Sequence, residues 1–182
     1  LERNKQCDGM PCEPHVLGSR PVAWFANWSL IVGTADMVWR SSLLLSMARQ
    51  ARHLRRSASA APAGLPRLTA AWALAMAGLC MPNEKKSWEK GVALLQRELQ
   101  NQVMADGGHI SRSPQIQLQI LSDLLMLRDA IRGRNLKVPN KLQHPIDRMA
   151  PAMQSFRHGD GRLSFLHGSG EGHKADHRPV GV

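Results

Sequence analysis

The residues best suited to proton transfer and carboxylate binding include a histidine and an arginine in one polar turn. His109 and Arg112 lie in the segment DGGHISRSP, which begins at Asp106. A histidine can act as a base near neutral pH, and an arginine can bind a carboxylate through two parallel hydrogen bonds. The alternative is a purely structural turn, in which Asp106 and the serines bond the free amides at the start of a helix.

A second histidine lies in a glycine-rich segment further along the chain. His158 and Asp160 belong to the sequence RHGDG, and together they could form a proton-transfer couple. With His167 and His173 they could also hold a metal, but this spacing matches no metal signature. We therefore expect no metal and no cofactor. The alternative role for the segment is a hinge between two domains.

The remaining candidates are cationic. The chain of 182 residues carries a net charge of +10, which favours polyanions such as nucleic acid, acidic lipid or acidic polysaccharide. Arg52 and Arg56 belong to a basic cluster, and Arg67 follows it closely. Guanidinium groups bind sulfates, carboxylates and phosphates alike. The alternative for the cluster is a solvated helix end, because cations favour the negative end of the helix dipole.

Several classes of function are disfavoured. We find no helix-turn-helix, zinc-finger or basic-zipper signature, so we do not expect nucleic acid to be the partner. The longest uncharged runs, residues 21–35 and 68–83, are shorter than the ~20 residues that span a bilayer. We therefore expect no membrane span. The odd number of cysteines argues against a disulfide framework.

The apolar spacing predicts an all-α fold of antiparallel helical hairpins. Asp36, Ser87 and Ser113 are the expected N-caps, and Trp72 is expected in the core more than in a sugar-binding cleft. Residues 57–64 are expected to be a flexible connection. A short strand-like segment is expected near the C-terminus, at residues 163–165. The predicted helices cover about 19–32, 37–56, 65–81, 88–104, 114–132 and 140–156, and the third, apolar nearly all round, should be central.

Four stretches of the sequence carry a family resemblance. They read ARQARHLRR, GLPRLTAAWALAMAGLCMP, DGGHISRSP and IDRMAPAMQSFRHGDGRLSFLHGSGEG. They resemble bacterial proteins of the heparinase II/III family, which comprises polysaccharide lyases and their relatives. The resemblance extends over about residues 14–171. It implies an incomplete α/α toroid followed by a β-sandwich domain, and a periplasmic location.

The resemblance also implies a domain organisation for this chain. We expect an irregular entry at residues 1–17 and a toroid fragment at 18–157. The glycine-rich start of a missing β-sandwich domain would follow at 158–170, and a disordered tail at 171–182. The β-sandwich domain of the longer protein is thus an expected partner of the helices.

The chemistry that the resemblance implies is β-elimination beside a uronic acid. In the better-known lyases an asparagine neutralises the acid, a tyrosine transfers the proton, and a histidine of the β domain assists. This chain has no tyrosine, and the tyrosine and asparagine positions fall at Ile116 and near Leu65. We therefore expect a fragment of a lyase for acidic polysaccharide that is inactive alone. The alternative is a non-catalytic basic module that binds polyanions.

The sequence thus gives one set of candidate residues for each role. The catalytic candidates are His109 and His158, and the substrate-binding candidates are Arg67, Arg112, Arg52 and Arg56.

Overall fold

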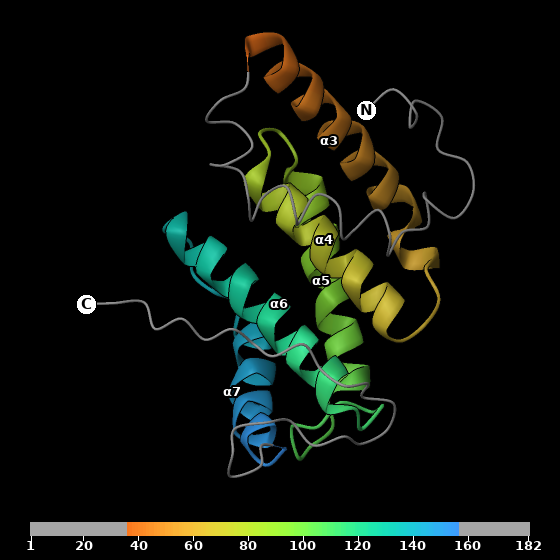
Figure 1. Ribbon diagram of the computed structural model, residues 1–182, viewed down its shortest axis with the longest axis vertical. Helices are drawn as coiled ribbons and strands as arrows, with labels where there is room; N and C mark the ends of the chain where they lie inside the picture. The colour runs from red at the N-terminus through yellow and green to blue at the C-terminus, as the bar shows by residue number, and fades with distance from the viewer. Residues whose placement is uncertain (1–35, 157–182) are drawn as a thin grey trace.

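The computed structural model describes residues 36–156, and all its regular secondary structure is helical (Figure 1). This confirms the predicted all-α fold. The expected helix at 19–32 and the strand-like segment at 163–165 lie outside the described residues. In chain order the elements are α3 (Met37–Ser57), the short 3₁₀ helix η3 (Ala58–Ala60), α4 (Leu65–Cys80), α5 (Lys85–Gln102), α6 (Pro114–Gly133) and α7 (Asn140–Gln154).

Two of the three predicted N-caps are confirmed. The Asp36 carboxylate accepts a hydrogen bond from the Trp39 amide at 2.7 Å, and the Ser113 hydroxyl accepts one from the Ile116 amide at 3.5 Å. The prediction for Ser87 is wrong. Helix α5 begins at Lys85, because the Glu84 carbonyl already accepts the Ser87 and Trp88 amides. Ser87 is buried inside the first turn and donates its hydroxyl hydrogen to the Glu84 carboxylate.

The connection at residues 57–64 is more ordered than the sequence predicts. Its first residues form η3, and the side chains of Ala58 and Ala61 are buried. The Arg67 guanidinium donates a hydrogen bond to the Ala61 carbonyl at 2.8 Å. The expected flexible connection is therefore wrong, because the small side chains of Ala58 and Ala61 pack in the hydrophobic core.

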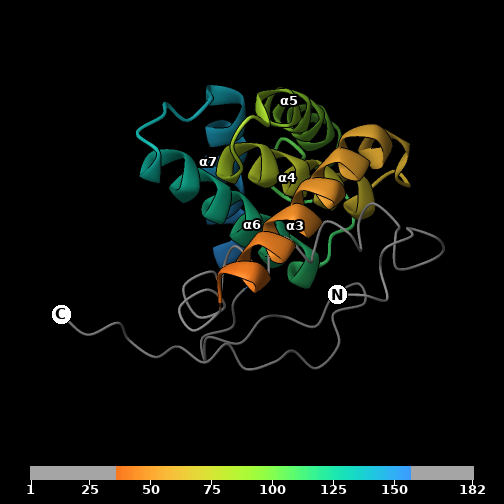
Figure 2. The same ribbon diagram turned by 90° about the horizontal axis from the view of Figure 1, so that it is seen from above.

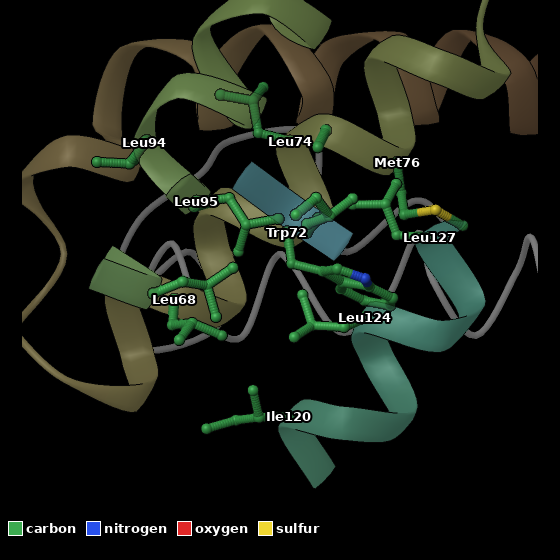
Figure 3. Close-up of a cluster of buried hydrophobic side chains, with 14 of the residues drawn as sticks. Leu68, Trp72, Leu74, Met76, Leu94, Leu95, Ile120, Leu124 and Leu127 are labelled. Atoms are coloured by element: carbon green, nitrogen blue, oxygen red, sulfur yellow. The ribbon is translucent and has the colours of Figure 1, made fainter. Parts of the chain in front are cut away.

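Helix α4 is the centre of the fold, as its uniformly apolar sequence predicts. It contacts α3, α5 and α6, and Figures 1 and 2 show these helices around it. Trp72 is only 2% exposed and lies among Leu68, Leu95 and Leu124 (Figure 3). Its indole N–H donates to the Asp123 carbonyl at 2.6 Å, which satisfies the one polar atom of the side chain. The core interpretation of Trp72 is confirmed.

Trp39, Leu43, Met47 and Leu54 recur at helical spacing, which predicts that all four lie on the buried side of α3. Leu43, Met47 and Leu54 are buried as expected, but Trp39 is 36% exposed. The buried positions of α3 begin at Leu43, one turn after Trp39, so the tryptophan lies beyond the packed part of the helix.

Helices α4 and α5 approach each other backbone to backbone. A Cβ atom on Gly91 would lie 2.4 Å from the Ala75 nitrogen, and one on Gly78 would lie 2.1 Å from the Trp88 nitrogen. Both distances are shorter than real Cβ contacts, so any larger residue would push the helices apart. The two glycines thus set the spacing of this pair.

Replacing Gly91 with alanine should destabilise the protein. The added methyl group would meet the α4 backbone, and overpacking of this kind costs about 1–3 kcal/mol. Urea titration followed by far-UV circular dichroism would measure the loss. Gly133→Ala is the matched control, because a Cβ atom there meets nothing within 4 Å. It should be neutral or stabilise by about 0.4–1 kcal/mol. Equal unfolding midpoints for the two variants would contradict this interpretation of the contact.

Candidate functional site

Of the two predicted residues of the polar turn, His109 belongs to a buried network where α4 begins, α5 ends and α6 begins. We call it the turn network. In Figure 1 it lies in the region of the connection between α5 and α6. Its members come from α4, α5, the connection and α6, and they are Arg67, Glu98, Gln102, His109, Ser111 and Gln117.

Gln102 links three elements through its side-chain amide. The Nε2 atom donates to the Gly64 carbonyl at 3.1 Å and to the Glu98 carboxylate at 3.0 Å. The Oε1 atom lies 3.1 Å from His109 Nε2. Because an amide oxygen only accepts, His109 Nε2 must carry the ring hydrogen. His109 Nδ1 is then an acceptor, and it receives the Ser111 amide hydrogen at 3.1 Å.

Gln117 ties the same turn to α7. Its Oε1 atom accepts from the His109 amide at 2.8 Å, and its Nε2 atom donates to the Gly107 carbonyl at 3.0 Å. A second, longer bond of 3.4 Å reaches the Met149 carbonyl on α7. The glutamine is 1% exposed, so these bonds replace its contacts with water.

His109 is almost fully buried in this network. It is 3% exposed, and burial lowers the pKa of its imidazole below the ordinary value. Both ring nitrogens already have partners, Gln102 on one side and Ser111 on the other. To accept a proton from a substrate, the ring would first have to give up a bond that holds the turn. The contacts give His109 a structural role, and its predicted catalytic role stays a prediction.

Within the turn network, Arg67 forms an ion pair with the buried Glu98. Its guanidinium lies 3.7 Å from the Glu98 carboxylate, and Arg97 lies 3.4 Å from the same oxygen. Glu98 is 3% exposed, so the two cations compensate its buried charge. The Arg67 side chain is 24% exposed and that of Arg97 59% exposed. Both arginines therefore present some positive charge to solvent.

Arg112 closes the turn that precedes α6. Its backbone has a φ of 53°, and its guanidinium donates to Asp106 at 2.6 Å. This hydrogen bond, together with one from the Gly108 amide, holds the pKa of the Asp106 carboxyl below its usual value. Gly107 has a φ of 81°, and a Cβ atom there would lie 2.1 Å from the Arg148 carbonyl. The predicted tight turn is confirmed, with Arg112 41% exposed at its edge.

The other predicted residues are not brought to this network. Arg52 and Arg56 are exposed on the last turns of α3. Lys90 Nζ donates to the Arg55 carbonyl at 2.5 Å, which places the end of α3 near the start of α5. Gln102 lies twelve residues further along α5, or about 18 Å along the helix axis. His158 lies outside the described residues.

The positions expected for the tyrosine and the asparagine carry no polar side chain. Ile116 and Leu65 are partly buried and pack against the hydrophobic core. Neither can transfer a proton or bond a carboxylate through its side chain.

The sequence interpretation missed the polar residues that organise this end of the fold. Glu98, Gln102 and Gln117 occupy inward positions of helices whose neighbouring inward residues are leucine and isoleucine. A polar residue in such a stripe is the signal that could have identified them, because a buried polar group needs partners.

Asp123 is a further carboxylate that the sequence did not single out. It lies on α6, two turns after Ile116, and is 8% exposed. Burial raises the pKa of Asp123 to about 6, and a hydrogen bond from Gln119 Nε2 at 3.0 Å opposes this rise. A carboxyl group with such a pKa can exchange protons near neutral pH.

An open hollow of about 370 Å³ lies where α4 ends and α5 begins, and its lining includes Trp88 and Arg134 but none of the predicted site residues. Within residues 36–156, no group of histidine, cysteine and acidic side chains could hold a metal. No helix of that range combines the length and the apolar content needed to cross a bilayer.

Comparison with known proteins supports the resemblance. The family model described as "Heparinase II/III N-terminus" matches residues 26–176. FtsZ-localized protein C of Caulobacter vibrioides is 35% identical over 128 residues, which are 70% of this chain and 22% of that protein.

Solved structures of heparinase III and of the heparan sulfate lyase HepC share the fold. Heparinase III superposes with a TM-score of 0.72 at 23% identity, over 87% of this chain and 26% of that protein. The heparan sulfate lyase HepC of Pedobacter heparinus gives a TM-score of 0.63 at 23% identity, over 82% of this chain and 24% of that protein. The predicted helical toroid portion is thus confirmed. The chain spans about a quarter of the length of the proteins it matches.

The buried His109 should make stability depend on pH. Its folded-state pKa lies below the ordinary value of 6.5, so the unfolded chain binds the proton more readily. The stability contributed by neutral His109 is therefore complete above about pH 6.5 and is lost as the pH falls through the lowered folded-state pKa. Urea titrations at several pH values between 8 and 5 would measure this loss. In His109→Gln this part of the pH dependence should disappear.

Two comparisons isolate the effect. His144, exposed on α7, provides the matched control His144→Gln, which should keep the pH dependence of the parent protein. Asp123 acts in the opposite sense in part of this range, but it is present in all three proteins and cancels in the difference. If the free energy of unfolding changed with pH to the same extent in the parent protein and in His109→Gln, the pH dependence could not be assigned to His109.

Proposed function

Because this chain belongs to the heparinase II/III family through its N-terminal helical domain, we propose that it is part of a protein acting on acidic, uronic acid-containing polysaccharide. In this proposal the helices bind the sugar chain but do not cleave it alone. The observation that carries the proposal is the family match over residues 26–176. The β-sandwich domain and the periplasmic location implied by the resemblance are parts of the same proposal.

Charge and side-chain chemistry support binding. The chain has a net charge of +10, and Arg97 and Arg112 expose guanidinium groups on either side of the turn network. A guanidinium can pair with a carboxylate in a planar, bidentate geometry. Exposed arginines on a rigid helical frame therefore suit the uronate groups of an acidic polysaccharide.

The residues at the expected catalytic positions do not favour cleavage by this chain. β-Elimination requires a group that neutralises the uronate, a base for the C5 proton and an acid for the leaving oxygen. Ile116 and Leu65 occupy the positions expected for the tyrosine and the asparagine, and the chain contains no tyrosine. Within residues 36–156, His109 is already bonded at both ring nitrogens.

The purified chain should bind heparin without depolymerising it. We expect retention on heparin resin at low ionic strength and release by salt, because the Debye length shortens from about 10 Å at 0.1 M to about 3 Å at 1 M. The absorbance of unsaturated uronate should stay flat with heparan sulfate, alginate and hyaluronan. Active heparinase III is the positive control. Turnover by this chain would refute the claim of inactivity, and passage through the resin at low salt would refute the claim of binding.

A second candidate function comes from the relative with a cell-division name. FtsZ-localized protein C shares 35% identity with this chain, above the 21–23% of the lyase structures. Apolar side chains at the two lyase positions fit a family member whose role is binding to protein. In this case the chain would act at a site where FtsZ is located.

A pull-down with purified Caulobacter vibrioides FtsZ separates the two candidates. The leading proposal predicts that the immobilised chain retains heparin and not FtsZ. Retention of FtsZ, unaffected by added heparin and combined with no retention on heparin resin, would favour the second candidate.

A further inference from the structure

We propose that the exposed sides of α3 and α5 together form an anion-binding surface for a linear acidic polysaccharide. We call it the α3–α5 surface and define it by Arg52 and Arg56 of α3 with Lys86, Lys90 and Arg97 of α5. The inference rests on the proposed function for the class of ligand. It adds the location of a binding surface that the family match does not give.

The contribution of α3 comes from its outer side. Leu43, Met47 and Leu54 are buried on one side of the helix, and its last turns have Arg52 and Arg56 in exposed positions. The two arginines are four residues apart, so they lie on the same side of the helix, about 6 Å apart along its axis. The guanidinium groups of both arginines are thus exposed to solvent on the same side of α3.

The contribution of α5 is a stripe on its exposed side. Lys86, Lys90 and Arg97 follow one another at spacings of four and seven residues, which keeps them on one side of an α-helix. All three are exposed, whereas Gly91 and Leu95 occupy the buried side. The stripe extends about 16 Å along the axis, which is long enough to contact several sugar units.

A contact between distant parts of the chain brings the two helices together. Lys90 Nζ donates to the Arg55 carbonyl at 2.5 Å, and the Arg55 guanidinium lies 3.7 Å from the Glu84 carboxylate. The last turn of α3 is therefore held beside the first turns of α5. Figure 2 shows the end of α3 approaching α5, so the charges of both helices belong to one region of the surface.

The nearby acids do not neutralise this surface. Glu84 is paired with Arg55, and Glu89 lies 3.8 Å from Lys85. The buried Glu98 is shared by Arg67 and Arg97.

Three cations of the α3–α5 surface lack such acidic partners. Within the part of the chain that the structure describes, no carboxylate pairs with Arg52, Arg56 or Lys86. Their charges therefore act on solvent and on approaching anions.

The side chains of this region favour a polysaccharide over a nucleic acid. Proteins that bind single-stranded nucleic acid stack bases on exposed aromatic rings. Trp88, the aromatic residue nearest to Lys86 and Lys90 in sequence, is instead packed against the core. Exposed arginines and lysines without aromatic partners suit the carboxylates or sulfates of an acidic sugar chain.

The test replaces three side chains that make no ion pair within residues 36–156, so the contacts of the fold described above are kept. The variant Arg52→Gln/Arg56→Gln/Lys86→Gln removes three positive charges from the α3–α5 surface. The matched control Arg132→Gln/Lys137→Gln/Lys141→Gln removes three exposed charges from the α6–α7 side. Both are titrated with a fluorescent heparin oligosaccharide at fixed salt, and thermal unfolding checks that both are folded.

We expect the surface variant to raise the Kd for heparin by about tenfold or more, because three exposed ionic contacts with the anion are lost. The control should change the Kd by less than about threefold. Equal Kd values for the two variants, with binding by the parent chain, would overturn this inference and leave the proposed function standing. No binding by the parent chain would overturn both.

A parallel titration with duplex DNA decides the class of ligand. We expect the parent chain to bind DNA more weakly than heparin at the same salt concentration. Tighter binding of DNA that the surface variant loses would overturn the assignment to polysaccharide.

Discussion

The close contact between the backbones of α4 and α5 determines how the other elements are arranged. Gly78 and Gly91 let the two helices approach until no side chain fits between them at those points. Helix α4 is therefore buried on nearly every side, and α5 has one inner and one outer side. Glu98 and Gln102 lie on the inner side of α5, in the turn network. Lys86, Lys90 and Arg97 lie on its outer side and are exposed to solvent.

This arrangement separates the buried polar residues from the exposed cationic ones. The side chains of Gln102, His109 and Gln117 form hydrogen bonds that hold the turn between α5 and α6. These bonds explain why polar residues occupy inward positions there. Arg52, Arg56 and Lys86 lie exposed on that frame and contribute no ion pair to it within residues 36–156. A basic surface on a rigid helical frame fits binding of an acidic polymer. It does not require the proton-transfer groups that the lyases of the family use.

Local signals predicted much of the fold. The helices follow from apolar spacing, and Asp36, Ser113 and the DGG turn mark boundaries through their own backbone chemistry. The predictions were wrong where the local structure depends on contacts with residues that are distant in the sequence. Ser87 is a good N-cap by type, but it is buried beneath the start of α5, and residues 57–64 become ordered because Ala58 and Ala61 pack against the core. The partners of His109 could not be predicted, since Gln102 and Gln117 meet it only after α5 and α6 fold together.

The proposed role of these helices is to hold an acidic polysaccharide without cleaving it. Calorimetric titration of the chain with a heparan sulfate oligosaccharide of defined size, followed by mass spectrometry of the recovered sugar, tests both halves in one sample. We expect saturable, salt-sensitive binding and an oligosaccharide that is recovered at its original mass. Shorter products carrying an unsaturated uronate, or the absence of binding at low salt, would contradict the proposed role.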